Sequence, residues 1–178
     1  MGGVIMDFKS LQQLIKAVSE SNLTSFEVEQ DGLKIKMKKE IEDISSAVPK
    51  DKEPVKAFIY DSGEDSPFTS CNGLPADLIR LAGGVNIFKD GEKPWANVTW
   101  EEVVNRNPEY IIVMQYNAAD NVEEKINFLK NNAALKDVDA IKNNNIFVLG
   151  LSDVVAGVRN SNTIKTMAEK FHPEAFKN

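Results

Sequence analysis

The sequence predicts an α/β fold: a parallel sheet with helices on both faces, forming a three-layer α/β/α lobe, preceded by a small N-terminal helix–β-hairpin unit. Beyond residue 55, short apolar runs alternate with amphipathic helical patterns, which is the order typical of a parallel sheet. The run Tyr110–Met114 is continuously apolar, as expected of a strand covered on both faces. A charged stretch with two prolines, residues 40–55, separates the two parts.

Residues 6–39 are expected to form the helix–hairpin appendage. Asp7 is placed to cap a helix whose apolar residues fall on one face: Phe8, Leu11, Leu14, Ile15 and Val18. Asp31-Gly32 is a signal for a two-residue hairpin turn, which sets Val28 opposite Ile35. Residues 40–55 are interpreted as a linker, because they are charged, contain proline and show no periodicity. The α/β lobe then covers residues 56–178.

The first part of the lobe alternates apolar and polar segments. We expect a strand at 55–60, a polar loop at 61–73, a short apolar piece at 85–88 and a loop at 89–94 that leads to Trp95. Between the loops, Leu74, Leu78 and Leu81 are at helical spacing. Pro75 suits the first turn of this helix, and Gly83-Gly84 suits its end.

The stretch Lys93–Tyr116 gives the clearest local signals. Thr99 followed three residues later by Glu102 is a capping box, and Asn107-Pro108 ends the helix that the box begins. The strand Tyr110–Met114 follows. Further along we expect a helix capped by Asn121, a short helix or turn at 134–142, a strand at 146–151 and a last helix at 161–171.

Composition narrows the function classes. The chain has 178 residues with 42% hydrophobic and 27% charged residues, which fits a soluble globular protein, and a net charge of −6 argues against a nucleic-acid partner. Cys71 is the single cysteine, so no internal disulfide is expected. No apolar run reaches membrane-spanning length, and the first residues are too short and too weakly basic for a signal peptide. As written, the chain is therefore expected to be cytoplasmic.

Catalytic motifs do not emerge from the sequence. It contains no phosphate-binding loop, dinucleotide glycine fingerprint, nucleophile elbow or metalloprotease helix, so we expect no enzyme, no cofactor and no metal site. The acidic residues Asp61, Glu64 and Asp65 do not have the spacing of a calcium loop and are interpreted as a solvated loop. His172, the single histidine, is expected at the surface or at a helix cap.

Ligands of open parallel sheets bind beyond the carboxyl ends of the strands. Three loops meet this condition, after Tyr60, after Gln115 and after Leu151. Trp95 is either a binding platform in its loop or a lid on the core. Arg159 either holds an anionic ligand or pairs with Asp153. The sequence leaves both alternatives open.

Residues 6–40, MDFKSLQQLIKAVSESNLTSFEVEQDGLKIKMKKE, resemble the N-terminal part of the biotin carboxyl carrier protein of bacterial acetyl-CoA carboxylase. In that family this region is associated with contact to the carboxylase partner, which implies biotin carboxylase as a partner of residues 6–39. The biotin-accepting Ala-Met-Lys-Met motif is absent, so biotin attachment is not implied.

Residues 57–178 resemble the C-terminal lobe of class III periplasmic solute-binding proteins. Three blocks carry the resemblance, in the family's order: AFIYDSGEDSPFTSCNGLPADLIRLAGGVNIF, PWANVTWEEVVNRNPEYIIV and IFVLGLSDVVAGVRN. These proteins serve ABC importers, so the resemblance implies the binding of a metal chelate such as an iron–siderophore, haem or cobalamin.

The same resemblance implies roles for single residues. Trp95, Asp153 and Arg159 match positions that line the ligand cleft. Tyr60 ends a strand that leads into the cleft, and we expect it to bind the ligand as well. Glu101 matches the glutamate that docks into an arginine pocket of the membrane permease.

Two features of the resemblance shape our expectations. The family has another lobe before this one, whereas here the carrier-like segment stands in its place, as in a natural fusion, a truncation or an engineered chain. We therefore expect weak ligand binding, since one lobe offers about half the walls of a cleft.

The alternative functions are an interaction module that docks biotin carboxylase, with the lobe as a passenger, and a small flavodoxin-like enzyme.

Overall fold

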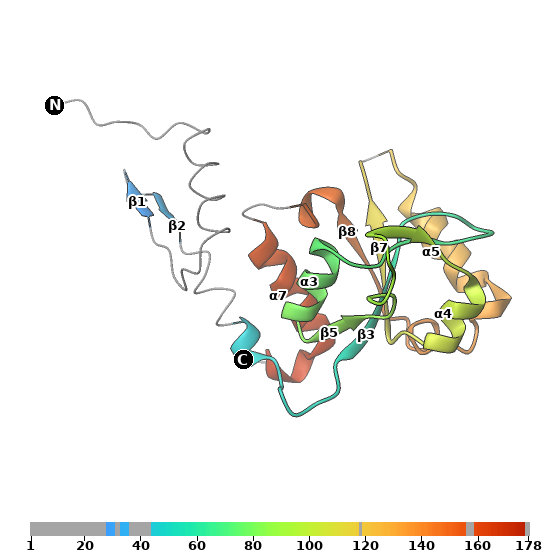
Figure 1. Cartoon of the computed structure of the whole chain (residues 1–178), viewed down its shortest axis with the longest axis horizontal. Coiled ribbons are helices and arrows are strands. Elements are labelled where there is room, and N and C mark those ends of the chain that lie inside the picture. The colour runs from blue at the N-terminus through green and yellow to red at the C-terminus, as the bar shows by residue number, and fades with distance from the viewer. Residues whose placement is uncertain (1–27, 31–32, 36–43, 118, 156–158, 177–178) are drawn as a thin grey trace.

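Four parallel strands form the central sheet, in the order β5-β3-β7-β8 (Figure 1). The computed structural model describes residues 28–30, 33–35, 44–117, 119–155 and 159–176. The strands are β3 (Val55–Tyr60), β5 (Gly84–Asn86), β7 (Tyr110–Gln115) and β8 (Ile146–Gly150). The predicted fold class, a parallel sheet covered by helices, is confirmed.

Helices cover both faces of this sheet. One face carries α3 (Leu74–Leu81) and α7 (Asn160–Phe171), and the other carries α4 (Trp100–Arg106) and α5 (Val122–Asn131), with the short η1 (Ala133–Leu135) and α6 (Asp139–Lys142) (Figure 1). Successive residues of β7 point to opposite faces, so Ile112 belongs to the core under α3 and α7, and Ile111 to the core under α4 and α5. Both are fully buried, which explains the continuous apolar run in the sequence.

The strand order changes direction at β3: the chain first adds β5 on one side of β3 and then adds β7 on the other side. The chain leaves β3, passes through α3 and returns to β5 at the edge of the sheet. It then passes through α4 to β7, on the other side of β3. The chain leaves β3 toward α3 on one face and leaves β7 toward α5 on the other. In such a sheet, the opening between these two connections, beyond the carboxyl ends of β3 and β7, is the usual place of a ligand.

A second, two-stranded sheet lies where the sequence predicts loops. β4 (Phe68–Ser70) pairs antiparallel with β6 (Trp95–Asn97), and Ser70 lies opposite Trp95. The expected loop at 61–73 is therefore wrong in part, and Trp95 lies in a strand rather than in a loop. Strands of three residues are too short to show an alternating pattern, and the fully buried Thr69 and Ser70 are polar, so hydrophobicity gives no signal.

Part of the expected linker, residues 40–55, packs on the lobe. Residues 44–47 form a helical turn, and Ile44 and Val48 join the core beneath α3 and α7, each 9% exposed. The hydroxyl of Ser45 donates to the carbonyl of Leu81, at 3.2 Å. Val48 also lies against Gly83, whose φ of 83° and lack of a Cβ permit the approach. The lobe therefore includes residues from Ile44 onward. The sequence pattern did not indicate burial of Ile44 and Val48, because most of the surrounding residues are charged or polar.

The hairpin is described only in its strands. β1 (Val28–Gln30) pairs antiparallel with β2 (Leu33–Ile35), and Val28 lies opposite Ile35, as predicted. The helix expected over residues 8–18 lies outside the described residues. Among the helices that the structure describes, none is long and apolar enough to cross a membrane.

The packing of residues 44–48 makes a first prediction. Val48→Ala removes buried methyl groups, so it should lower the free energy of unfolding by about 1–2 kcal/mol. The matched control is Val155→Ala, because Val155 is 48% exposed and its loss should cost less than about 0.5 kcal/mol. Urea denaturation measures both variants. Equal effects would show that residues 44–48 do not belong to the core of the lobe.

Candidate functional site

Asp61 and Tyr116 meet at the opening between β3 and β7. Asp61 directly follows β3 and is 4% exposed. Its carboxylate accepts hydrogen bonds from the hydroxyl of Tyr116, just after β7, and from that of Ser62. Burial, together with the hydrogen bond to Asp61, raises the pKa of Tyr116 to about 12, so its hydroxyl stays protonated and can donate at neutral pH. This contact joins the ends of two neighbouring strands.

The loop after β7 is held in place by a cation. Lys125 Nζ donates to the carbonyl of Met114 and to Asp120 Oδ2, both at 2.9 Å. Asp120 Oδ2 also accepts from the backbone amide of Tyr116, at 3.1 Å. The hydrogen bond from Lys125 holds the pKa of Asp120 below its usual value, so the ion pair persists at neutral pH. Tyr116 is thereby held at a fixed position while the residue stays 45% exposed.

The segment after β8 forms its own turn. Asp153, in η2 (Leu151–Asp153), accepts from the amide of Gly150 at 2.9 Å, and its carbonyl accepts from Thr163 at 3.0 Å. Arg159 is exposed and directly precedes α7. No salt bridge joins Arg159 to Asp153, although the structure describes both residues. Of the two alternatives for Arg159, pairing with Asp153 is therefore not realised.

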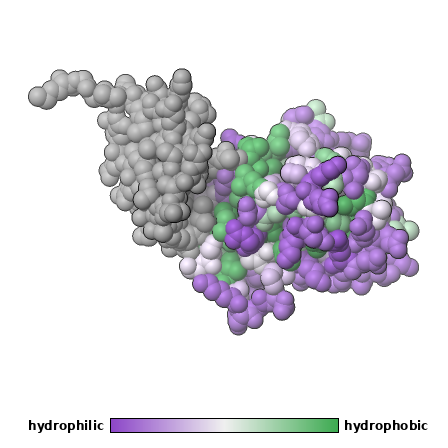
Figure 2. All heavy atoms as spheres, viewed as in Figure 1, coloured by the Kyte–Doolittle hydropathy of each residue, from purple (hydrophilic) through white to green (hydrophobic). Residues whose placement is uncertain are grey.

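Exposed apolar side chains gather where the chain leaves the carboxyl ends of β7 and β8. Among the described residues, four large hydrophobic side chains are exposed, and three of them follow β7 or β8: Tyr116, Leu151 and Val155, at 45%, 38% and 48%. Figure 2 shows hydrophobic residues over the segment that follows β8. We call this surface, Tyr116 with Leu151, Val155 and Arg159, the carboxyl edge.

Trp95 lies on the β3 side of the same opening. It is half-buried as the first residue of β6, and its ring stacks on Phe68, with centroids 5.7 Å apart and planes at 24°. The carbonyl of Phe68 accepts from the backbone amide of Asp61, at 3.0 Å. By strand order, Trp95 therefore belongs to the β3 side, Arg159 to the β8 side, and Tyr116 stands between them.

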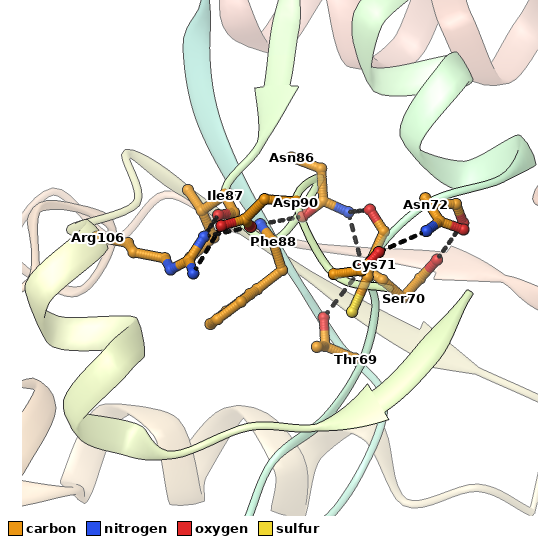
Figure 3. Close-up of polar contacts among 10 residues, drawn as sticks. Thr69, Ser70, Cys71, Asn72, Asn86, Ile87, Phe88, Asp90 and Arg106 are labelled. Carbon is orange, nitrogen blue, oxygen red and sulfur yellow. Dashed lines mark hydrogen bonds and ion pairs between the residues drawn. The ribbon is translucent and has the colours of Figure 1, made fainter. Parts of the chain in front are cut away.

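The amide of Asn86 fixes the sheet that carries Trp95 (Figure 3). Asn86 is 2% exposed at the end of β5, and its Nδ2 donates to the carbonyls of Ser70 and Cys71, at 2.7 and 3.2 Å. Its Oδ1 accepts from the amide of Phe88, at 2.9 Å. One buried side chain thus joins β5, β4 and the loop that leads to β6.

Arg106, the last residue of α4, holds that loop from the other side. It donates to the carbonyl of Ile87 and forms a salt bridge with Asp90, at 2.6 Å (Figure 3). Its guanidinium also lies 4.5 Å from the centre of the Phe88 ring. The loop before Trp95 is therefore tied to β5 and to α4 at once.

Tyr60 does not reach the opening. It is 2% exposed and packs against Trp100 and Phe128 beneath α4 and α5. Burial raises its pKa to about 12. Tyr60 is therefore a core residue, and its expected role in ligand binding is wrong for this arrangement. The exposed phenol ring belongs to Tyr116, which no sequence pattern indicated.

The predicted capping box of α4 is confirmed. Thr99 accepts from the amide of Glu102, at 3.2 Å, and Glu102 accepts from the amide of Thr99, at 3.0 Å. Glu101 occupies the second position of the helix and is exposed, without a salt bridge in the part of the chain that the structure describes. Its carboxylate is therefore available to a partner.

Three further residues have structural roles. Asp61 is buried, so its assignment to a solvated loop is wrong, whereas Glu64 and Asp65 are exposed. His172 is also buried: it caps the end of α7, with Nε2 3.3 Å from the carbonyl oxygen of Gly83. Burial raises the pKa of Cys71, which disfavours the reactive thiolate. Within the described ranges, no three His, Cys, Asp or Glu residues are placed to hold a metal ion.

Comparisons with known proteins agree with this geometry. A family model described as periplasmic binding protein matches residues 10–151. A periplasmic binding protein from Veillonella parvula is 32% identical, with a TM-score of 0.71 over 77% of this chain and 48% of that one. A periplasmic heme-binding protein from Roseiflexus, at 19% identity, shares the fold with a TM-score of 0.64 over 78% of this chain and 54% of that one. A vitamin B12-binding protein from Yersinia pestis is 37% identical over 62 residues, 34% of this chain and 22% of that protein.

These matches correct one expectation and leave another untested. The chain spans about half the length of the solved structures named above. The expected cytoplasmic location is wrong, because the matching family model and the similar protein from Veillonella parvula are both described as periplasmic. That expectation relied on the first residues of the given sequence alone. None of these matches supports the resemblance of residues 6–40 to biotin carboxyl carrier protein, which stays a prediction.

The contacts of Asn86 predict a large effect of its removal. Asn86→Ala removes two hydrogen bonds to buried carbonyls and one from a buried amide, so the free energy of unfolding should fall by about 1–3 kcal/mol. The control is Asn97→Ala, because Asn97 is exposed and its amide donates to Ser66 at the surface, at 3.2 Å. Thermal denaturation, followed by tryptophan fluorescence, measures both variants. A control as unstable as Asn86→Ala would contradict the role given to Asn86.

Proposed function

Because the chain belongs to the periplasmic binding protein family, whose model matches residues 10–151, we propose that it supplies one lobe of the substrate-binding component of an ABC importer. The proposed ligand is a metal chelate such as cobalamin, haem or an iron–siderophore. The role is binding and delivery, without catalysis. The partner of the loaded protein is the membrane permease of the importer.

The carboxyl edge is the observation that carries this proposal. A chelate presents a broad, partly apolar surface, often with carboxylates at its rim. Tyr116 offers an exposed aromatic ring, and Leu151 and Val155 offer aliphatic contact. Arg159 offers a cation that forms no salt bridge with any residue that the structure describes. Good ligand sites combine such an apolar surface with a few polar groups. The curated relative from Yersinia pestis supports this ligand class, because it is named for vitamin B12, a cobalt chelate.

Trp95 and Asp153 have supporting roles in the proposed site. Trp95 extends the aromatic surface on the β3 side, through its stacking on Phe68. Asp153 keeps the turn after β8 closed through its bond to the amide of Gly150. That turn carries Leu151, so the role of Asp153 is to hold Leu151 in position for contact with the ligand.

The test is binding of cyanocobalamin, haemin and ferrichrome by calorimetry. We expect at least one of these chelates to bind, and Tyr116→Ala to weaken that binding about tenfold, which corresponds to about 1.4 kcal/mol. Arg159→Ala should weaken the binding of a carboxylate-bearing chelate most. Controls are Val148→Ala, an exposed residue within β8, and Arg80→Ala, an exposed arginine on α3. Binding of none of the three chelates, or equal effects of test and control variants, would contradict the site.

The proposed contact with the permease is Glu101. Glu101→Arg should leave chelate binding unchanged and reduce association with vesicles that carry the cognate importer. Glu123→Arg is the matched control, since Glu123 is also exposed at the second position of a helix, α5. Both variants remove a negative charge near a helix N-terminus, so each should lose about 0.3–1 kcal/mol of stability. If both reduce association equally, Glu101 has no special place in docking.

The alternative function is docking of biotin carboxylase through residues 6–39. It rests on the sequence resemblance and on the hairpin register of Val28 with Ile35. Recovery of biotin carboxylase by the immobilised chain, but not by a variant lacking residues 6–39, would support it.

A further inference from the structure

A groove lies beside α4, apart from the carboxyl edge. Its volume is about 420 Å³, and its lining is Glu64, Asp65, Trp100, Phe128, Asn131 and Asn132. The rings of Trp100 and Phe128 are both half-buried, with centroids 5.6 Å apart, and they form an aromatic wall. None of the six lining residues is a cation, and two are exposed acids.

The two acids are not neutralised by the described part of the chain. Its salt bridges involve neither Glu64 nor Asp65. The other polar side chains of the lining, Asn131 and Asn132, carry no charge to offset them. The groove therefore joins negative charge to aromatic rings, a combination that attracts a cation by charge and by its contact with the ring faces.

The groove is preformed. Trp100 Nε1 donates to the carbonyl of Glu64, at 2.6 Å, so the indole and the acidic loop hold each other. Phe128 stacks on the buried Tyr60, with planes at 20°. The hydroxyl of Ser66 donates to the carbonyl of Val98, at 3.0 Å, which ties the same loop to the segment before α4. Binding in this groove would order few additional groups.

We propose that this groove receives an arginine side chain of the importer permease, as a second contact beside Glu101. The partner's identity rests on the proposed function, whereas the chemistry of the groove does not. A guanidinium is planar, so it stacks on an aromatic face while its N–H groups reach carboxylates. Trp100 lines the groove and Glu101 follows it in α4, so one short helix would present both contacts.

The experiment measures the groove directly, by NMR with the full chain and no chelate. The probe is the peptide acetyl-Gly-Arg-Gly-amide, and its citrulline analogue is the neutral control. We expect the arginine peptide to shift the indole N–H signal of Trp100 and the side-chain amides of Asn131 and Asn132. The double variant Glu64→Gln/Asp65→Asn should weaken the peptide's affinity at least fivefold. Phe128→Leu, which keeps the apolar volume and removes the ring, should also weaken it.

The control variant is Glu53→Gln/Glu92→Gln. It removes two exposed charges from other loops and should leave the peptide's affinity unchanged. Equal shifts with the citrulline peptide, or equal losses in the two double variants, would overturn the proposal. So would an arginine peptide that shifts none of the three groove signals. Since no chelate is present, a failure here is distinct from a failure of chelate binding at the carboxyl edge.

Discussion

The hydrogen bond between Tyr116 and Asp61 determines where this lobe can meet a ligand. Strand order leaves an opening between β3 and β7, and these two residues end those strands. Asp61 is 4% exposed, and a carboxylate removed from water must be satisfied by donors. The hydroxyl of Tyr116 supplies one donor, so the phenol is fixed at its polar end while its ring stays exposed. The exposed residues after β8 then continue the same surface.

Local signals predicted most of the fold, and tertiary contacts explain the rest. The capping box of Thr99 and Glu102, the end of α4 before Pro108 and the buried strand β7 were predicted because neighbouring residues determine them. Asp61 and Tyr116 are far apart in the sequence, so their contact left no local pattern. The same holds for Ile44 and Val48, which find their apolar partners on α3 and α7. The candidate site was predicted as an edge of the sheet, but its exposed phenol ring was not.

One loop, residues 61–67, touches both proposed surfaces. At its start, Asp61 accepts from Tyr116 at the carboxyl edge. Three residues later, the carbonyl of Glu64 accepts from Trp100 at the groove. Gly63 makes the turn between them, with a φ of 90°, and a Cβ there would clash with the backbone oxygen of Ser66. Tyr116 and Trp100, one from each proposed surface, therefore both bond to this loop.

The proposed chelate site lies at the carboxyl ends of β3, β7 and β8. The most direct measurement is paramagnetic broadening of backbone amide signals by ferrichrome, whose ferric ion acts over a distance. We expect the strongest broadening at Ser62, Tyr116 and Leu151, and weak broadening at Val55 and Tyr110, at the opposite ends of β3 and β7. Strongest broadening at Val55 and Tyr110, or uniform broadening over the whole lobe, would rule out this site.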